Sequence, residues 1–152
     1  MNYIFKPPCA GVIIINNKDQ VLTVNTKKKH FGFPKGKRKK DETTLENALR
    51  ELEEETGITI DQIDIVDKVI ISEYKKPQSL NPNIQYFLGF LKDQYADLNK
   101  FTYDQEELDN VSWIYVNELL EFEDFNFKQA RKEVLREVYQ LVNQIRIDKK
   151  SN

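Results

Sequence analysis

The chain has 152 residues, of which 32% are charged and 39% hydrophobic, with a formal net charge of −2. This composition predicts one soluble globular domain over residues 1–152, and the single cysteine and single histidine exclude a disulfide within the chain and most histidine-based catalytic or zinc sites. No apolar run is long enough to span a membrane and the N-terminus lacks a signal-peptide core, so we expect a cytoplasmic protein without a membrane partner.

Short strands are predicted at the start of the chain. Residues 10–15 form a continuous apolar, β-branched run, which is typical of a buried strand. Residues 16–19 have the composition of a turn, so residues 21–24 are expected to pair back on the first strand as a hairpin. Residues 31–36 then predict a strand that ends in a turn at Pro34.

A basic stretch overlaps this last strand. Residues 27–40 contain eight lysines and arginines, and acidic segments follow them. A basic rim beside an acidic cluster suits a polyanionic substrate. A solvated loop is an equally good interpretation for residues 27–29. For Lys35 and Lys37, which flank Gly36, we favour contact with substrate.

An amphipathic helix follows the basic stretch. Four apolar residues recur at i, i+3, i+4 and i+7, the spacing of one helix face: Leu45, Ala48, Leu49 and Leu52. Thr43 and Glu46 have the spacing of a capping box, so the helix is predicted to begin there. Gly57 can adopt the left-handed conformation that ends a helix.

Three carboxylates gather on another side of this helix, within about one turn: Glu51, Glu54 and Glu55. Like charges at this spacing repel each other and destabilise an isolated helix. A hard divalent cation with oxygen ligands would offset the repulsion. The simpler alternative is a solvated acidic face.

Five further elements are predicted in the second half of the chain. They are one strand or two short ones, an aromatic strand, a third strand, a short helix and a long amphipathic helix: residues 63–74, 84–91, 111–116, 117–122 and 130–149. A polar loop joins the first two strands, and an acidic loop over residues 92–110 precedes the third. Strands before and after a central helix predict an α/β fold with a mixed sheet between helices.

The spacing of fixed residues in segment 36–58 narrows this interpretation. This segment resembles the Nudix box at each fixed position: Gly36, five residues, Glu42, seven residues and then Arg50-Glu51-Leu52-x-Glu54-Glu55-x-Gly57-Ile58. The resemblance implies an α/β/α sandwich with a mixed sheet. It also implies a hydrolase that cleaves a phosphoanhydride in a nucleoside diphosphate linked to another group, using Mg²⁺, for which Mn²⁺ often substitutes.

The resemblance also implies roles for single residues. It assigns three carboxylates and one main-chain carbonyl as metal ligands: Glu51, Glu54, Glu55 and Gly36. Arg50 matches the arginine that orients a catalytic glutamate, and Glu46 at i−4 offers it a helical ion pair. Glu42 matches the position that braces the loop.

The general base varies within the family. It lies either in the box, where Glu54 is the candidate, or on a later loop. Glu107 lies six residues before Trp113, the spacing of the catalytic glutamate in decapping members, and Glu106 competes with it.

The residues that flank the box give information about the identity of the substrate. Residues 32–42, GFPKGKRKKDE, are similar to GFPKGKxxKDE of mRNA-decapping Nudix hydrolases, while PKGK alone also occurs in dinucleoside polyphosphate and diphosphoinositol polyphosphate hydrolases. We therefore expect hydrolysis of an mRNA cap or RNA 5′ end, with the small-molecule substrates as the alternative. The intact box disfavours a binding module without activity. Four basic residues of the last helix face RNA or simply form its solvated side: Lys128, Arg131, Lys132 and Arg136.

Overall fold

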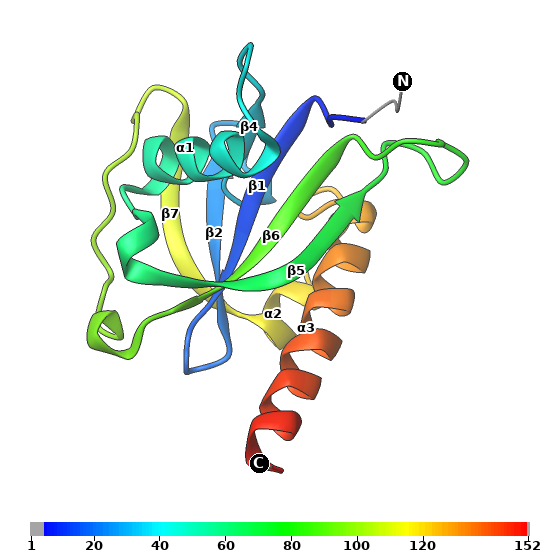
Figure 1. Ribbon diagram of the computed structural model, residues 1–152. Helices are drawn as coiled ribbons and strands as arrows, with labels where there is room; N and C mark the ends of the chain where they lie inside the picture. Colours follow the sequence, from blue (N-terminus) through cyan, green and yellow to red (C-terminus); the bar gives the residue numbers. More distant parts are fainter. Residues whose placement is uncertain (1–4, 152) are drawn as a thin grey trace.

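A mixed β-sheet lies between helix α1 on one face and helices α2 and α3 on the other (Figure 1). The computed structural model describes residues 5–151. Its strands are β1 (Cys9–Ile15), β2 (Gln20–Thr26), β3 (Phe31–Gly32), β4 (Lys35–Lys37), β5 (Ile63–Glu73), β6 (Ile84–Leu91) and β7 (Leu108–Tyr115). Its α-helices are α1 (Thr44–Thr56), α2 (Val116–Leu120) and α3 (Gln129–Lys150), and single 3₁₀ turns occupy Ile60–Gln62 and Asp93–Tyr95. The predicted α/β/α sandwich is confirmed.

Strand β1 lies at the centre and supplies both halves of the core. Val12 and Ile14 point toward α1, while Ile13 and Ile15 point toward α2 and α3. All four are fully buried or nearly so. This alternation follows from the two-residue period of a strand, and it explains why the first strand is apolar at every position rather than at alternate ones.

The sheet is mixed because β1 runs parallel to β6, while β5 pairs with β6 in the antiparallel sense. The predicted hairpin is only partly correct. Strands β1 and β2 pair at one position, Ile15 opposite Val21, and then diverge. Strand β2 instead pairs along its length with β7, from Gln20 opposite Tyr115 to Thr26 opposite Leu108. The start of β1 cannot accept β2, because β4 already occupies that edge.

The predicted strand over residues 31–36 is two short strands, β3 and β4, on either side of Pro34. Val12 donates its main-chain N–H to the Pro34 carbonyl at 3.2 Å. A Cβ added to Gly11 would lie 2.2 Å from that carbonyl oxygen, which is too close for any side chain. Because Gly11 has no side chain, the main chain at Pro34 can pack directly against β1. The group that approaches Gly11 so closely is therefore protein backbone.

Several boundaries differ from the predicted ones. Strand β7 begins three residues earlier than expected, at Leu108, and α2 begins one residue earlier, at Val116. Strand β5 is one strand whose pairing with β6 shifts between Ile65 and Ile70. Within residues 5–151, no helix combines the length and apolar character needed to cross a membrane.

Helix α3 packs on the sheet through four buried residues: Val134, Leu135, Val138 and Val142. Two basic residues near its start also turn inward. Arg131 lies 3.4 Å from the buried Glu73 carboxylate, and Lys132 pairs with Asp124 at 3.1 Å. These contacts favour the interpretation of α3 as a packing helix.

Candidate active site

Helix α1 begins and ends as predicted. Thr43 accepts a hydrogen bond from the Glu46 N–H, and the Glu46 carboxylate accepts one from the Thr43 N–H. Gly57 ends the helix at φ 82°. The predicted apolar stripe is shorter than expected, since Leu45 is 38% exposed while Ala48 and Leu52 are fully buried.

Asn47 connects the helix to β4, and no pattern in the sequence marks it as special. It is fully buried. Its Nδ2 donates to the Gly36 carbonyl at 3.2 Å and to the Lys37 carbonyl at 3.4 Å. These bonds fix the main chain of β4, and with it the Gly36 carbonyl, against the first turns of α1.

Arg50 is the centre of the charged network on α1. Its guanidinium forms two hydrogen bonds with the Glu42 carboxylate, at 2.6 and 2.9 Å. It also donates to Glu51 at 2.9 Å, to Glu54 at 3.2 Å and to the Lys37 carbonyl at 2.8 Å. The Arg50 hydrogen bonds and the Lys39 N–H lower the pKa of Glu42 to about 2. Arg50 thus holds two of the three box carboxylates and braces them through Glu42.

The predicted ion pair between Arg50 and Glu46 is wrong. Over the described part of the chain, the ion pairs of Arg50 are with Glu42, Glu51 and Glu54. Glu46 is committed to the capping box instead, because its carboxylate caps the Thr43 N–H.

Glu51 packs directly against Gly36. A Cβ added to Gly36 would lie 2.1 Å from the Glu51 carboxyl carbon, so only glycine leaves room for this carboxylate. Burial raises the pKa of Glu51, against the hydrogen bond from Arg50.

Glu55 is held from the other side by the main chain of β4. The Lys35 N–H donates to its carboxylate at 2.9 Å. Burial raises the pKa of Glu55 to about 7, against the Lys35 N–H, and the negative charges of Glu51 and Glu107 raise it further. This carboxylate therefore lies where a bound cation would be strongly favoured.

The raised pKa of Glu55 predicts that the metal-free protein loses stability as the pH rises. Its pKa lies near 7 in the folded chain and at 4.5 without the fold. Between these values the unfolded chain loses the proton first, so the free energy of unfolding should fall from pH 4.5 to 7, by up to about 3 kcal/mol. Melting temperatures in EDTA at pH 5 and pH 8 measure this. The decline should be smaller in Glu55→Gln and unchanged in Glu53→Gln, an exposed neighbour; equal declines in all three proteins would contradict the assignment.

A cavity of about 300 Å³ lies beside these carboxylates. It is lined by Glu51, Glu54, Glu55, Asp104, Glu107 and Leu108. Glu107 thus joins the box carboxylates, whereas Glu106 is not among the lining residues. A turn explains this, because the Asp104 carbonyl accepts from the Glu107 and Leu108 N–H groups. Asp104 was not predicted as a site residue, since nothing distinguishes it within an acidic loop.

The chemistry of this cavity fits a hard divalent cation. Its five carboxylates supply oxygen donors, which are the ligands that Mg²⁺ and Mn²⁺ prefer. Gly36 is not among the lining residues, and its carbonyl accepts the Asn47 amide. Within residues 5–151 no three side chains are already arranged as a metal site. Arg50 instead supplies the positive charge for Glu51 and Glu54, so these two carboxylates would turn toward a bound cation.

The basic stretch is only partly available to a ligand. Lys27 pairs with Asp109 at 3.1 Å, and Lys29 pairs with the same carboxylate. The Lys35 side chain is mostly buried, and burial and the Arg131 guanidinium lower its pKa, against the nearby Glu55 carboxylate. Lys37 is exposed.

Comparisons with known proteins agree with this geometry. The sequence model of the NUDIX domain matches residues 5–138. An RNA pyrophosphohydrolase of Marinomonas sp. (strain MWYL1) is 24% identical over 144 residues, which cover 84% of this chain and 89% of that protein. An RNA pyrophosphohydrolase of Erythrobacter litoralis is 28% identical over 126 residues, covering 73% and 77%.

Solved structures share the fold. The binary complex of a C. elegans Ap4A hydrolase superposes with a TM-score of 0.72 at 21% identity, covering 90% of this chain and 98% of that one. The E. coli dihydroneopterin triphosphate pyrophosphohydrolase gives 0.62 at 16% identity, covering 89% and 97%.

Proposed function

The chain belongs to the NUDIX family, and the relatives compared above are named RNA pyrophosphohydrolases. From this premise we propose that it cleaves a phosphoanhydride at the 5′ end of RNA with a divalent metal ion. The observation that carries the proposal is the cavity in which Glu107 faces the three carboxylates of the box. The RNA substrate is supported by the relatives named RNA pyrophosphohydrolases, which match over most of their length.

In this proposal the box holds the metal ion. Glu51, Glu54, Glu55 and the Gly36 carbonyl bind Mg²⁺, or Mn²⁺ in its place. A divalent ion at such a site neutralises charge on the phosphates and lowers the pKa of bound water. Arg50 keeps Glu51 and Glu54 in position, and its two bonds to Glu42 fix the guanidinium.

Glu107 is the proposed general base. It stands across the cavity from the box, on the loop before β7, where it can accept a proton from the attacking water. Glu54 is the alternative base within the box. It is the most exposed of the box carboxylates in the Arg50 network, with 53% of its side chain accessible.

Lys35 and Lys37 are the proposed phosphate contacts. They flank Gly36 on β4, next to the metal ligands. No ion pair within residues 5–151 involves either ammonium group. The exposed Lys37 is therefore the more accessible of the two to a substrate, since burial lowers the pKa of Lys35.

A dinucleoside polyphosphate or diphosphoinositol polyphosphate is the second candidate substrate. The pairing of Lys27 and Lys29 with Asp109 favours it, because these ion pairs reduce the positive charge available to a long RNA. Capped RNA is the third substrate class, and the experiment below compares all three.

The test compares kcat/KM for 5′-triphosphorylated RNA, capped RNA, dinucleoside polyphosphates and diphosphoinositols, with RNA of increasing length at two salt concentrations. If RNA crosses the basic stretch, its affinity should fall with salt at a slope of roughly −0.7 per phosphate contact. Replacing Lys27, Lys28 and Lys29 by Ala removes three positive charges but frees Asp109, so the slope should flatten by about 1.4.

A double variant at the far end of α3, Lys149→Ala/Lys150→Ala, is the control and should leave the slope unchanged. Rates on a dinucleoside polyphosphate should barely respond to the triple variant. A rate that does not depend on RNA length, together with a triple variant equal to wild type, would instead support the small-molecule substrate.

A further inference from the structure

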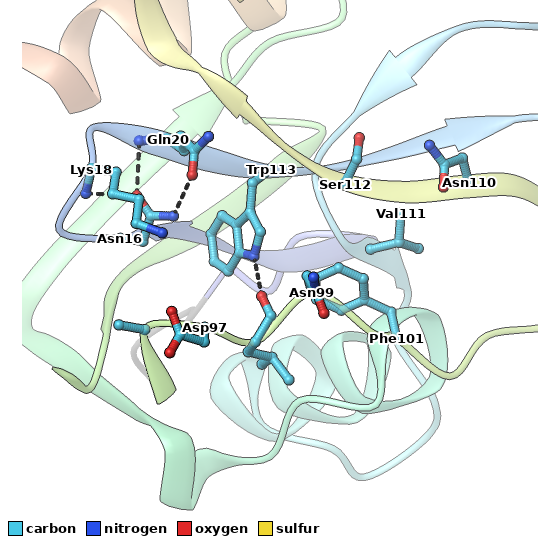
Figure 2. A pocket seen from close by; sticks show the side chains of 12 residues that line it. Asn16, Lys18, Gln20, Asp97, Asn99, Phe101, Asn110, Val111, Ser112 and Trp113 are labelled. Atoms are coloured by element: carbon cyan, nitrogen blue, oxygen red, sulfur yellow. Dashed lines mark hydrogen bonds between the residues drawn. The ribbon is translucent and has the colours of Figure 1, made fainter. Parts of the chain in front are cut away.

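A second groove, separate from the carboxylate cavity, runs along strand β7. It has a volume of about 550 Å³ and lies between β7 and residues 96–101 (Figure 2). Four amide side chains and two aromatic rings line it: Asn16, Gln20, Asn99, Asn110, Phe101 and Trp113. Its charged lining residues, Lys18 and Asp97, have opposite signs. The groove therefore suits a neutral polar group, unlike the cavity with its five carboxylates.

The amides of this groove differ in what they already bind. The Asn16 Nδ2 donates to the Gln20 Oε1 at 2.8 Å, and the Asn16 Oδ1 accepts from two main-chain N–H groups of its turn. The Gln20 Nε2 and the Asn99 amide make no hydrogen bond to other residues of segment 5–151, and Asn99 is exposed. An amide presents donors and an acceptor in one plane. This pattern matches the edge of a nucleobase, as in the pairing of Asn or Gln with adenine.

The aromatic part of the groove is held rigidly. The Trp113 indole N–H donates to the Leu98 carbonyl at 2.7 Å. Phe101 packs edgewise on the indole, with ring centroids 6.3 Å apart. The indole stays half-buried and lies between Gln20 and Asn99 in Figure 2. A fixed, partly open aromatic ring beside free amides is a suitable surface for a base, since stacking tolerates every base.

The same strand connects the two sites. Leu108 lines the carboxylate cavity at the start of β7, while Val111 and Trp113 line the groove. At roughly 3.3 Å per residue, three to five residues of strand separate the sites by about 10–16 Å. A stacked nucleic-acid strand advances about 3.4 Å per nucleotide, so three to five nucleotides cover this distance.

We propose that the groove binds a base of the RNA substrate, about three to five nucleotides downstream of the 5′ end that reacts at the carboxylate cavity. This inference rests on the proposed function, because it assigns the groove to the same RNA. A base contact in the groove would make the protein selective for RNA that extends at least three to five nucleotides beyond its 5′ end. Short phosphoanhydrides would be bound by the carboxylate cavity alone.

The single tryptophan of the chain allows a direct test. Its fluorescence is measured in Mg²⁺ while 5′-monophosphorylated RNA, which has no phosphoanhydride to cleave, is added as a mononucleotide or a hexanucleotide. The hexanucleotide should change the emission and the mononucleotide should not. In Gln20→Ala/Asn99→Ala the Kd for the hexanucleotide should be about tenfold weaker, through loss of two amide contacts.

The matched control is Gln78→Ala/Asn81→Ala, which removes the same two residue types from an exposed loop away from the groove. It should bind like wild type and keep the wild-type melting temperature, whereas Gln20→Ala/Asn99→Ala should melt slightly lower because the Asn16 Nδ2 loses its acceptor. All proteins should keep their kcat/KM for a dinucleoside polyphosphate. Two results would overturn the groove assignment while the proposed function stands. In one, wild type hydrolyses RNA but its tryptophan emission responds equally to the mononucleotide and the hexanucleotide. In the other, the two double variants bind the hexanucleotide with equal Kd. If RNA is neither hydrolysed nor bound, both fail.

Discussion

Glu55→Gln should lower kcat on the order of 10³-fold at saturating Mg²⁺. A metal ion supplies several kcal/mol of charge stabilisation to phosphoryl chemistry. Glu55 is a proposed metal ligand whose position is fixed by the Lys35 N–H at 2.9 Å. Glutamine keeps the shape but removes the negative charge that the metal ion needs. EDTA should abolish wild-type activity, and Mg²⁺ or Mn²⁺ should restore it.

The neighbouring Glu53 provides the control for this prediction. It lies on the same helix, is exposed, and does not line the cavity. Glu53→Gln should therefore keep wild-type kcat. The Glu55→Gln protein should fold without metal as well as wild type does, because one of several repelling charges is gone. Near-normal turnover by Glu55→Gln at saturating Mg²⁺ would remove Glu55 from the proposed metal ligands.

Glu107→Gln should lower kcat by about 10²–10⁴-fold, the usual contribution of a general base. Glu106→Gln should have little effect, because Glu107 lines the carboxylate cavity and Glu106 does not. The pair is well matched, since the two glutamates are adjacent and both exposed. The measurement is the pH–rate profile of each variant under single-turnover conditions.

A general base also leaves a signature that a purely structural residue does not. In Glu107→Gln the single-turnover rate should fall while the Mg²⁺ concentration for half-maximal activity changes only slightly. Small and equal losses in both variants would place the base within the box, with Glu54 as the next candidate.

The central helix and its carboxylates were predictable because their signals are local. A capping box, a terminal glycine and three glutamates within one turn lie inside one short segment, and the structure reproduces the caps residue by residue. The same local reasoning failed for Arg50. Spacing alone favoured Glu46 as its partner, but Glu42 lies before the helix and reaches the guanidinium only once β4 has folded against α1.

The sequence patterns could not predict contacts between segments that lie far apart in the chain. The long pairing of β2 with β7 joins residues about ninety positions apart, and nothing in either strand identifies the other. Asn47 and Asp104 have no distinctive spacing, and the role of each depends on which main-chain groups lie beside it. The pairing of Lys27 and Lys29 with Asp109 depends on the same fold, and neither interpretation of residues 27–29 included it.

Arg50 also sets the order in which the active protein is assembled. Proteins whose buried ligands have no counter-charge of their own fold only when the metal ion arrives. Here a guanidinium already neutralises Glu51 and Glu54, and the backbone of β4 is tied to α1 through Asn47 and Arg50. A newly synthesised chain can therefore complete its fold in a metal-poor cell and take up its ion afterwards. A bound ion would then add stability mainly through Glu55, the box carboxylate that Arg50 does not contact.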